Sequence, residues 1–232
     1  MLGLTATAVI LAGTVTGLAN TGVFAGERPE PQVIVLPTTT AAASTAAEQM
    51  AQKTENDPLS ERVLGDPDAP ITILEYSSLT CPHCATFHAQ TLPELKKQYI
   101  DTGKAKLVFR DFPFDAVGLR ASMLARCSNP DRYFGFLDVL FKSQDKWARA
   151  QDPLKALAQT GKLAGVGQEQ FDACMGNETL INKLLERRME AEQKYQVNST
   201  PSFIISKGDV TERVEGAQPL EVFARAIDKV GS

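Results

Sequence analysis

The feature that most constrains the fold is a pair of cysteines placed directly after a short apolar run. The run covers residues 70–77 (PITILEYS), and its β-branched residues and leading proline predict a buried strand. Cys81 and Cys84 follow closely, with Pro82 at a position suited to the first turn of a helix. The chain must therefore pass from a central strand into a helix that starts at the first cysteine.

The pattern that follows places this strand and helix in an α/β architecture. Helical spacing continues to about residue 101, with a kink expected at Pro93, which removes a backbone hydrogen bond. Residues 104–113 (KAKLVFRDFP) predict a second strand. Because a helical crossover connects the two strands, we expect them to be parallel.

The middle of the chain predicts an all-helical insertion over about residues 115–196. Apolar side chains recur there at helical spacing, in three stripes: Tyr133, Leu137, Leu140 and Phe141; Leu154, Leu157 and Ala158; Ile181, Leu184, Leu185 and Met189. A hairpin around residues 207–209 and an amphipathic helix at residues 219–230 close the chain. The predicted order is strand–helix–strand, helical insertion, strand–strand–helix, an arrangement typical of the thioredoxin fold when two cysteines begin the first helix.

The N-terminal region, residues 1–57, is not expected to form part of this fold. Residues 1–25 lack charged side chains and are long enough for a secretory signal peptide or a membrane anchor, although the usual basic start is missing. Residues 26–57 are rich in Pro, Thr and Ala and predict a flexible linker. We therefore expect a folded domain over residues 58–232, located in the periplasm or bacterial cell envelope and either released or membrane-tethered.

Charge and cysteine content narrow the functional classes. A net charge of −4 argues against a general nucleic-acid or anionic-membrane partner. Four cysteines, an even number, fit an oxidising compartment. Four cysteines allow three connectivities, and the spacing favours pairing Cys81 with Cys84 and Cys127 with Cys174, the second pair being a structural disulfide inside the insertion. A second redox-active or regulatory bond is the alternative interpretation of Cys127 and Cys174.

Three other interpretations of the Cys81–Cys84 segment compete with a redox pair. Zinc bound by Cys81, Cys84 and His88 lacks a convincing fourth ligand. Covalent haem attachment requires a histidine directly after the second cysteine, where the chain has Ala85. Two inert thiols would oxidise behind an export signal. We therefore expect a redox-active disulfide that needs no metal and no cofactor.

The neighbours of the pair suggest how it would react. At the helix start, Cys81 faces unpaired backbone N–H groups and the positive end of the helix dipole, which favour its thiolate. His83 can add a cationic or hydrogen-bonding partner. Cys84 lies one turn further into the helix, where burial suits a resolving thiol. These positions make Cys81 the candidate nucleophile and the disulfide an oxidant.

Glu75 shares a strand face with the core residues Ile71 and Ile73, where an ionised carboxylate is costly unless it has a function. It could exchange protons with Cys84 through water; pairing with a lysine, or exposure at the strand end, is the alternative. For His88 we favour a packed or surface position over a catalytic one.

A second loop is expected opposite the cysteines. Residues 198–203 (NSTPSF) place an X-Pro bond directly before a strand. A cis Thr200–Pro201 bond would leave the backbone of Thr200 free to pair with an extended peptide, whereas a trans bond would make an ordinary loop. The context favours the cis form, and Thr200 and Pro201 are the candidate substrate-binding residues.

Over about residues 59–230 the chain resembles the DsbA-like family of bacterial thiol:disulfide oxidoreductases. The resemblance rests on LEYSSLTCPHC (residues 74–84) and VNSTPSF (residues 197–203). It implies a thioredoxin-like fold with a helical insertion, with Cys81 as nucleophile, Cys84 as resolving thiol and His83 as the residue that tunes the pair. It further implies that Glu75 is the buried acid and Pro201 the cis-proline.

The resemblance also implies partners. These are secreted proteins with free thiols, unfolded or folding, and a membrane quinone reductase of the DsbB type that reoxidises the pair; we expect a monomer. The chain departs from the best-studied enterobacterial members, which have valine in place of Thr200, and the Cys127–Cys174 pair occurs in some branches only.

Two alternative functions remain open at this point. One is a disulfide reductase or isomerase kept in the reduced state, although isomerases usually carry a dimerisation domain. The other is a chaperone that binds extended peptides and whose disulfides are merely structural. Introduction of disulfides into secreted proteins is the function that the motif favours.

Overall fold

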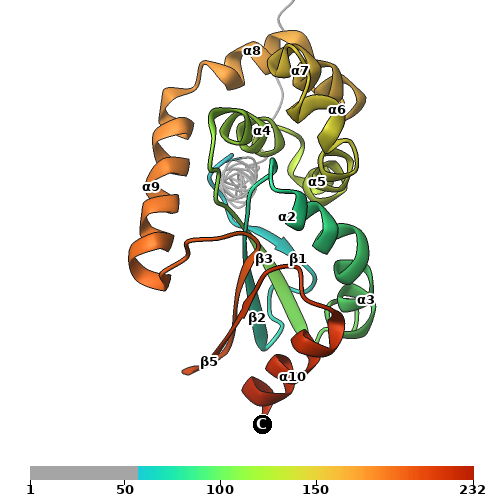
Figure 1. The fold of residues 1–232 in the computed structure, drawn as a ribbon, viewed down its shortest axis with the longest axis vertical. Helices are drawn as coiled ribbons and strands as arrows, with labels where there is room; N and C mark the ends of the chain where they lie inside the picture. The colour runs from blue at the N-terminus through green and yellow to red at the C-terminus, as the bar shows by residue number, and fades with distance from the viewer. Residues whose placement is uncertain (1–56) are drawn as a thin grey trace, which may run out of the picture. The chain divides into compact units, whose positions relative to one another are not determined.

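The computed structural model describes residues 57–232 (Figure 1). Residues 1–25, expected to be a signal peptide or anchor, and residues 26–56 of the expected linker lie outside the described residues. At the centre is a five-stranded sheet with the order β1-β3-β2-β4-β5. The strands are β1 (Arg62–Leu64), β2 (Ile71–Ser77), β3 (Ala105–Asp111), β4 (Ser202–Lys207) and β5 (Val210–Glu215).

The pairing of the strands is that of the expected fold. β2 and β3 are parallel, with Ile73 opposite Leu107, and the remaining pairs are antiparallel. β4 and β5 form the predicted hairpin, whose turn contains Gly208 at φ 57°. The final helix α10 (Leu220–Gly231) packs against both of these strands. The α/β class and the thioredoxin-like topology are therefore confirmed.

The crossover from β2 to β3 is helical and irregular around Pro93. It consists of α2 (Pro82–Thr86), the π-helical turn η1 (Phe87–Thr91), α3 (Leu92–Leu95) and a second π-helical turn η2 (Lys96–Ile100). Pro93 occupies the first turn of α3, directly after η1. Pro93 cannot donate a backbone hydrogen bond, and the wider turn directly before α3 accommodates its loss, so a π-helical turn lies where a kink was expected.

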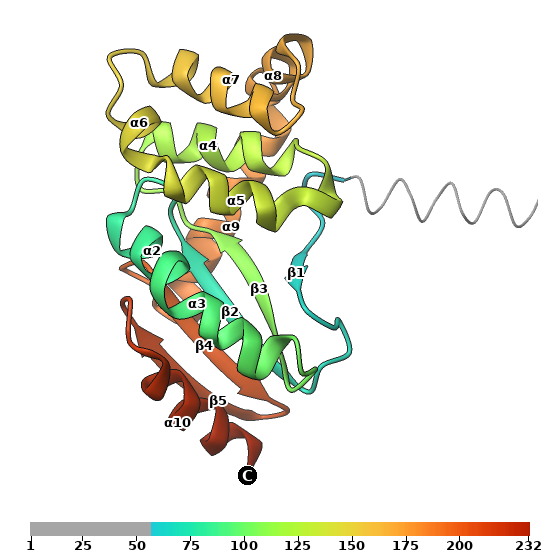
Figure 2. The ribbon, with the colours of Figure 1, turned by 90° about the vertical axis from the view of Figure 1, so that its right-hand side faces the viewer.

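Helices alone occupy the chain between β3 and β4. They are α4 (Ala116–Arg126), the 3₁₀ turn η3 (Pro130–Arg132), α5 (Tyr133–Lys142), α6 (Gln144–Ala148), α7 (Pro153–Leu163), α8 (Gln168–Met175) and α9 (Glu178–Tyr195). Figure 2 shows α4 to α8 stacked beyond one end of the sheet, while α9 runs along the face opposite α2 and α3. The insertion thus covers the sheet end at which β2 enters α2.

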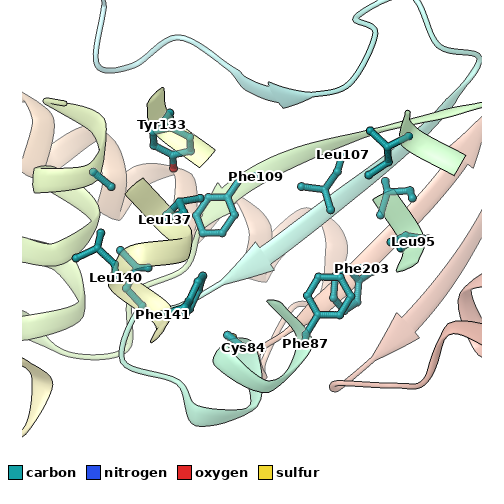
Figure 3. Close-up of a cluster of buried hydrophobic side chains, with 14 of the residues drawn as sticks. Cys84, Phe87, Leu95, Leu107, Phe109, Tyr133, Leu137, Leu140, Phe141 and Phe203 are labelled. Atoms are coloured by element: carbon teal, nitrogen blue, oxygen red, sulfur yellow. The ribbon is translucent and has the colours of Figure 1, made fainter. Parts of the chain in front are cut away.

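The sheet has a hydrophobic layer on each face because side chains alternate along each strand. On the α2–α3 side, Ile73 and Phe203 join a large buried cluster that includes Cys84 and residues of α5 (Figure 3). On the α9 side, Tyr76 and Ile204 pack with Ala191. The CxxC helix is therefore anchored by the principal core.

The apolar pattern of the insertion is buried only in part. Tyr133, Leu137, Leu140 and Phe141 are all buried. In the other two stripes Leu157 and Leu184 are buried, whereas Leu154, Leu185 and Met189 are exposed. The exposed residues of α9 lie beside the buried stripe, and helical spacing alone does not fix where the core boundary falls.

Within residues 57–232, no helix combines the length and the apolar character needed to cross a membrane.

Candidate active site

Cys81 lies where the turn after β2 enters α2. Its backbone N–H donates to Ser78 O at 3.0 Å, and its extended backbone (φ −80°, ψ 119°) makes it the N-cap residue of α2. The side chain is half-buried, whereas that of Cys84, one turn later, is buried, and both are free thiols. An incoming molecule can therefore reach the sulfur of Cys81 more easily than that of Cys84.

The pKa of Cys81 is lowered from 9.0 to about 5. The largest cause is a hydrogen bond from the Cys84 thiol, which outweighs the opposing effect of burial. The Thr200 hydroxyl and the backbone N–H groups of Cys84 and His83 add to the lowering. At neutral pH Cys81 is therefore a thiolate, the form that takes part in exchange.

The pKa of Cys84 is raised well above 9.0. Burial is the largest cause, and the hydrogen bond to Cys81 and the charge of its sulfur act in the same direction. One cysteine thus holds the negative charge and the other holds the proton that stabilises it. The pair titrates as a unit, with opposite roles for its two members.

The loop before β4 faces the pair, with the Thr200–Pro201 bond in the cis form. The backbone carbonyl oxygen of Thr200 lies 3.3 Å from Cys81 Sγ. The buried Thr200 hydroxyl has no hydrogen-bond partner among residues 57–232, and it lowers the pKa values of both cysteines. Thr200 therefore borders the reactive sulfur through both its backbone and its side chain.

Glu75 lies in the core beneath α2 and is fully buried. Its Oε1 atom is 2.8 Å from His88 Nε2, and its Oε2 atom has no partner among the described residues. Neither a lysine partner nor a solvent-exposed position, the two alternatives considered for Glu75, is observed. Among the described residues, Glu75 makes no hydrogen bond to Cys84.

His88 is the partner of Glu75 that sequence reasoning missed. It is buried, and its ring stacks on Phe141 with the centroids 4.2 Å apart. A packed or surface position was expected for His88; the structure shows the packed one, and the hydrogen bond to Glu75 was not expected. The sequence indicates only that His88 lies one helical turn after Cys84, on the same side of the helix. Nothing in the local pattern identifies Glu75 as its partner. Because His88 Nε2 bonds Glu75, it does not converge with the two sulfurs as a zinc ligand would.

The imidazole of His83 is exposed. In residues 57–232 it makes no hydrogen bond, and the contribution of His83 to the Cys81 thiolate comes from its backbone N–H group. Among these residues no group of three or more His, Cys, Asp or Glu side chains is arranged to hold a metal ion.

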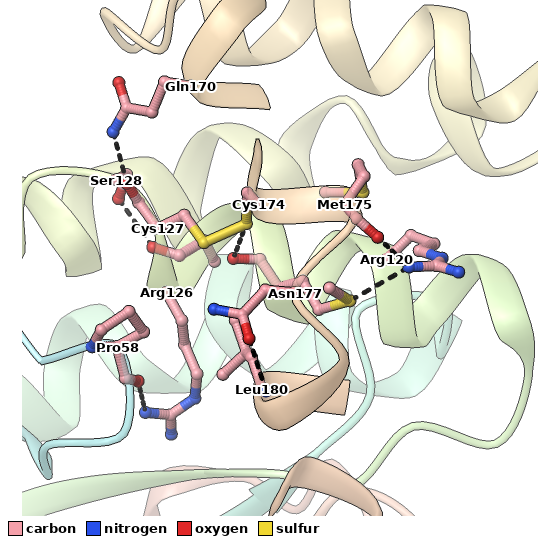
Figure 4. Close-up of a disulfide and its surroundings, with 12 residues drawn as sticks. Pro58, Arg120, Arg126, Cys127, Ser128, Gln170, Cys174, Met175, Asn177 and Leu180 are labelled. Carbon is pink, nitrogen blue, oxygen red and sulfur yellow. Dashed lines mark hydrogen bonds between the residues drawn. A yellow bond between two sulfur atoms is a disulfide. The ribbon is translucent and has the colours of Figure 1, made fainter. Parts of the chain in front are cut away.

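The other two cysteines form a disulfide within the insertion (Figure 4). It joins Cys127, at the end of α4, to Cys174 in α8, across 47 positions of sequence. Gln170 donates to the carbonyl of Cys127, and Cys174 Sγ lies 3.2 Å from Met123 O. The bond therefore ties α8 to α4.

Two contacts from the insertion hold the turn before Cys81. Asp115 caps α4 by accepting from Gly118 N, and its other oxygen accepts from the Thr80 hydroxyl at 2.6 Å. From α6, Gln144 donates to Leu79 O and to Cys81 O. No sequence pattern indicates the contact of Gln144, because a glutamine in a helical stretch is usually exposed.

Comparison with known proteins supports one family. Residues 58–229 match the family model described as Thioredoxin. A Rickettsia bellii protein named as a protein-disulfide oxidoreductase is 36% identical over 176 residues, covering 75% of this chain and 64% of that protein. The chain thus spans less than two thirds of this relative. Bacillus subtilis disulfide bond formation protein D is 27% identical, covering 62% of this chain and 67% of that protein.

A solved structure gives the same result. Wolbachia pipientis α-DsbA1 matches with a TM-score of 0.68 and 35% identity, covering 76% of this chain and 96% of that one. The chain therefore belongs to the thioredoxin family, in the DsbA-like group of bacterial thiol:disulfide oxidoreductases.

Proposed function

We propose that this protein is an exported dithiol oxidase that introduces disulfides into secreted proteins through Cys81 and Cys84. The single observation that carries the proposal is the contrast between a half-buried Cys81, whose pKa is lowered to about 5, and a buried Cys84, whose pKa is raised. A stabilised thiolate favours the reduced pair, so the Cys81–Cys84 disulfide is oxidising.

The reaction is two successive thiol–disulfide exchanges. A substrate thiolate attacks Cys81 Sγ, the Cys81–Cys84 bond breaks, and Cys84 leaves with the electron pair and takes up a proton. The substrate's second thiolate then attacks the substrate sulfur of the mixed disulfide, and Cys81 leaves as a thiolate. The substrate loses two electrons and the pair gains them. Burial of Cys84 directs the first attack to Cys81.

Glu75 and Thr200 have separate roles in this proposal. Glu75, through water, exchanges the proton that Cys84 gains on reduction and loses on reoxidation. The backbone of Thr200 and the cis Pro201 hold an extended substrate segment beside Cys81 by strand-like pairing. His83 tunes the pair through its backbone N–H group and through its exposed ring when a partner covers it. The Cys127–Cys174 bond is structural.

The cellular setting is inferred from the same chemistry. The protein acts in the periplasm or cell envelope as a monomer, with residues 1–25 directing export or tethering it. Its substrates are unfolded or folding secreted proteins with free thiols. A membrane quinone reductase of the DsbB type takes two electrons from the reduced pair and restores the disulfide.

Active-site serine variants test this function. With a reduced two-cysteine protein as substrate, the oxidised wild type should form the substrate disulfide stoichiometrically, and Cys81→Ser should abolish transfer. Cys84→Ser, first loaded as a mixed disulfide at Cys81 with a small thiol, should release that thiol and form a mixed disulfide with the substrate at Cys81. A peptide-binding chaperone with merely structural disulfides would tolerate Cys81→Ser, so retained activity in that variant would refute the proposal.

One observation favours a second function, a reductase or isomerase kept reduced. Thr200 borders both sulfurs, and in the family resemblance a threonine at this position also occurs in some isomerases. A scrambled-disulfide substrate separates the functions: an isomerase restores native pairing when supplied in the reduced form, whereas an oxidase adds bonds without correcting them.

A further inference from the structure

The carboxamide of Gln144 bridges two carbonyl groups of the active-site turn. Its Nε2 atom lies 2.7 Å from Leu79 O and 3.0 Å from Cys81 O. Both partners are acceptors, so the amide nitrogen faces them and uses both of its hydrogens. One side chain thus contacts the turn on either side of Thr80, two residues before Cys81 and at Cys81 itself.

Gln144 is well placed to hold this position. It is buried at the start of α6, and the corner between α5 and α6 is closed by Trp147, which is fully buried and donates to Leu140 O at 2.9 Å. Leu79 is also fully buried. Within the described residues its carbonyl receives only the hydrogen bond from Gln144, and loss of that donor would leave a buried acceptor unpaired.

We propose that Gln144 is a positioning residue of the reaction: it fixes the carbonyl groups of Leu79 and Cys81 and thereby the backbone conformation in which Cys81 reacts. The inference rests on the proposed function, because it concerns the reactivity of the same sulfur. It assigns a task in catalysis to α6, one of the inserted helices.

The link from Gln144 to the sulfur runs through the backbone of Cys81. The extended conformation of Cys81 turns its side chain toward the N–H groups of His83 and Cys84, which stabilise the thiolate. Cys81 O accepts from Ala85 N at 3.2 Å and from Gln144. Without Gln144, Leu79 O must turn toward water, and the peptide units on either side of Thr80 and Cys81 rotate with it.

Two variants and one control test the inference in the full protein. Gln144→Met keeps the length of the side chain and removes both donors, and Gln144→Glu places an acceptor against two carbonyl groups. Gln159→Met makes the same change on an exposed residue of α7. The readouts are the pKa of Cys81, from thiolate absorbance in the ultraviolet, and the equilibrium constant with glutathione.

We expect both Gln144 variants to raise the pKa of Cys81 from about 5 to about 6 or higher, a tenfold loss of thiolate at low pH. The equilibrium constant with glutathione should shift by about tenfold toward the disulfide. Gln159→Met should leave both quantities unchanged. A purely structural role would lower the melting temperature of the Gln144 variants and leave the pKa of Cys81 where it was, which would overturn the inference.

Hydrogen exchange in the wild type provides a test that does not depend on folded variants. The side-chain amide protons of Gln144 should exchange slowly, because both are bonded inside the protein, and rapid exchange would overturn the inference even if no variant folds. Failure of the proposed function would look different. In that case the wild type itself would have an ordinary Cys81 pKa and would not oxidise a dithiol substrate.

Discussion

Cys81 and Cys84 are the same residue type one turn apart at the start of one helix, and hydrogen bonding to the first and burial of the second give them opposite chemistry. Cys81 at the helix start accepts hydrogen bonds from Cys84 and the backbone, so its pKa falls to about 5. Cys84, one turn later, is buried and keeps its proton, so its pKa rises. At the scale of single residues, reactivity therefore follows from position along the first helical turn.

The Glu75–His88 pair makes a second prediction at this scale. Replacing His88 with Phe keeps an aromatic ring beside Phe141 but leaves the buried carboxyl group unpaired. We expect the free energy of unfolding to fall by about 3 kcal/mol, as for other buried groups that lose one partner. Urea unfolding at pH 7 measures the change.

A double variant controls this experiment. In His88→Phe with Glu75→Leu both polar partners are gone, so most of the lost stability should return. If instead the stability losses of His88→Phe and Glu75→Leu add up in the double variant, the two residues are not coupled and the contact between Glu75 and His88 does not stabilise the protein.

At the scale of elements, the Cys127–Cys174 bond links α4 to α8 and closes a loop of 47 positions. On the chain-entropy model such a crosslink stabilises the folded protein by about 4 kcal/mol. We expect Cys127→Ala with Cys174→Ala to lower stability by up to that amount in denaturant unfolding. Dithiol oxidation by Cys81 and Cys84 should be unchanged, and a change in its rate would indicate that the bond has a redox or regulatory role.

Local patterns predicted the elements that are self-contained in sequence. The strand before Cys81, the strand at residues 104–113, the β4–β5 hairpin and the interruption at Pro93 all follow from periodicity and from the chemistry of Pro and Gly. β1 was missed because three residues are too short to show alternation.

The contacts that complete the site could not be predicted in the same way. Gln144 is 63 positions from Cys81, and His88 is 13 from Glu75. Such contacts depend on how α6 packs against the active-site turn and how η1 packs against the sheet, which no short pattern encodes. The sequence identified the reacting atoms, whereas tertiary packing decides what holds them.

At the scale of the whole molecule, the charge on Cys81 links redox state to stability. In the reduced protein, Cys81 is a thiolate over a pH range in which the unfolded chain binds a proton there. Its contribution to stability is therefore fully present above about pH 9 and is lost as the pH falls to about 5. The raised pKa of Cys84 destabilises the reduced protein only at high pH, where Cys84 loses its proton in the unfolded chain but keeps it in the folded one.

The difference in unfolding free energy between the reduced and oxidised protein tests this linkage, because other titrating groups cancel. We expect the unfolding free energy of the reduced form to increase relative to that of the oxidised form as the pH rises from about 5 to about 8. Cys81→Ser, compared in the same way under reducing conditions, should lose this slope. A flat difference in the wild type would mean that Cys81 is not charged at neutral pH.

The reduction potential of the Cys81–Cys84 pair measures the central claim most directly. The purified protein is equilibrated with glutathione buffers of known potential at pH 7, and the reduced fraction of the pair is followed. Stabilisation of the Cys81 thiolate predicts a potential well above the value of about −270 mV that is typical of a reducing thioredoxin. A potential at or below that value would contradict the account, because the pair would then favour reducing disulfides over making them.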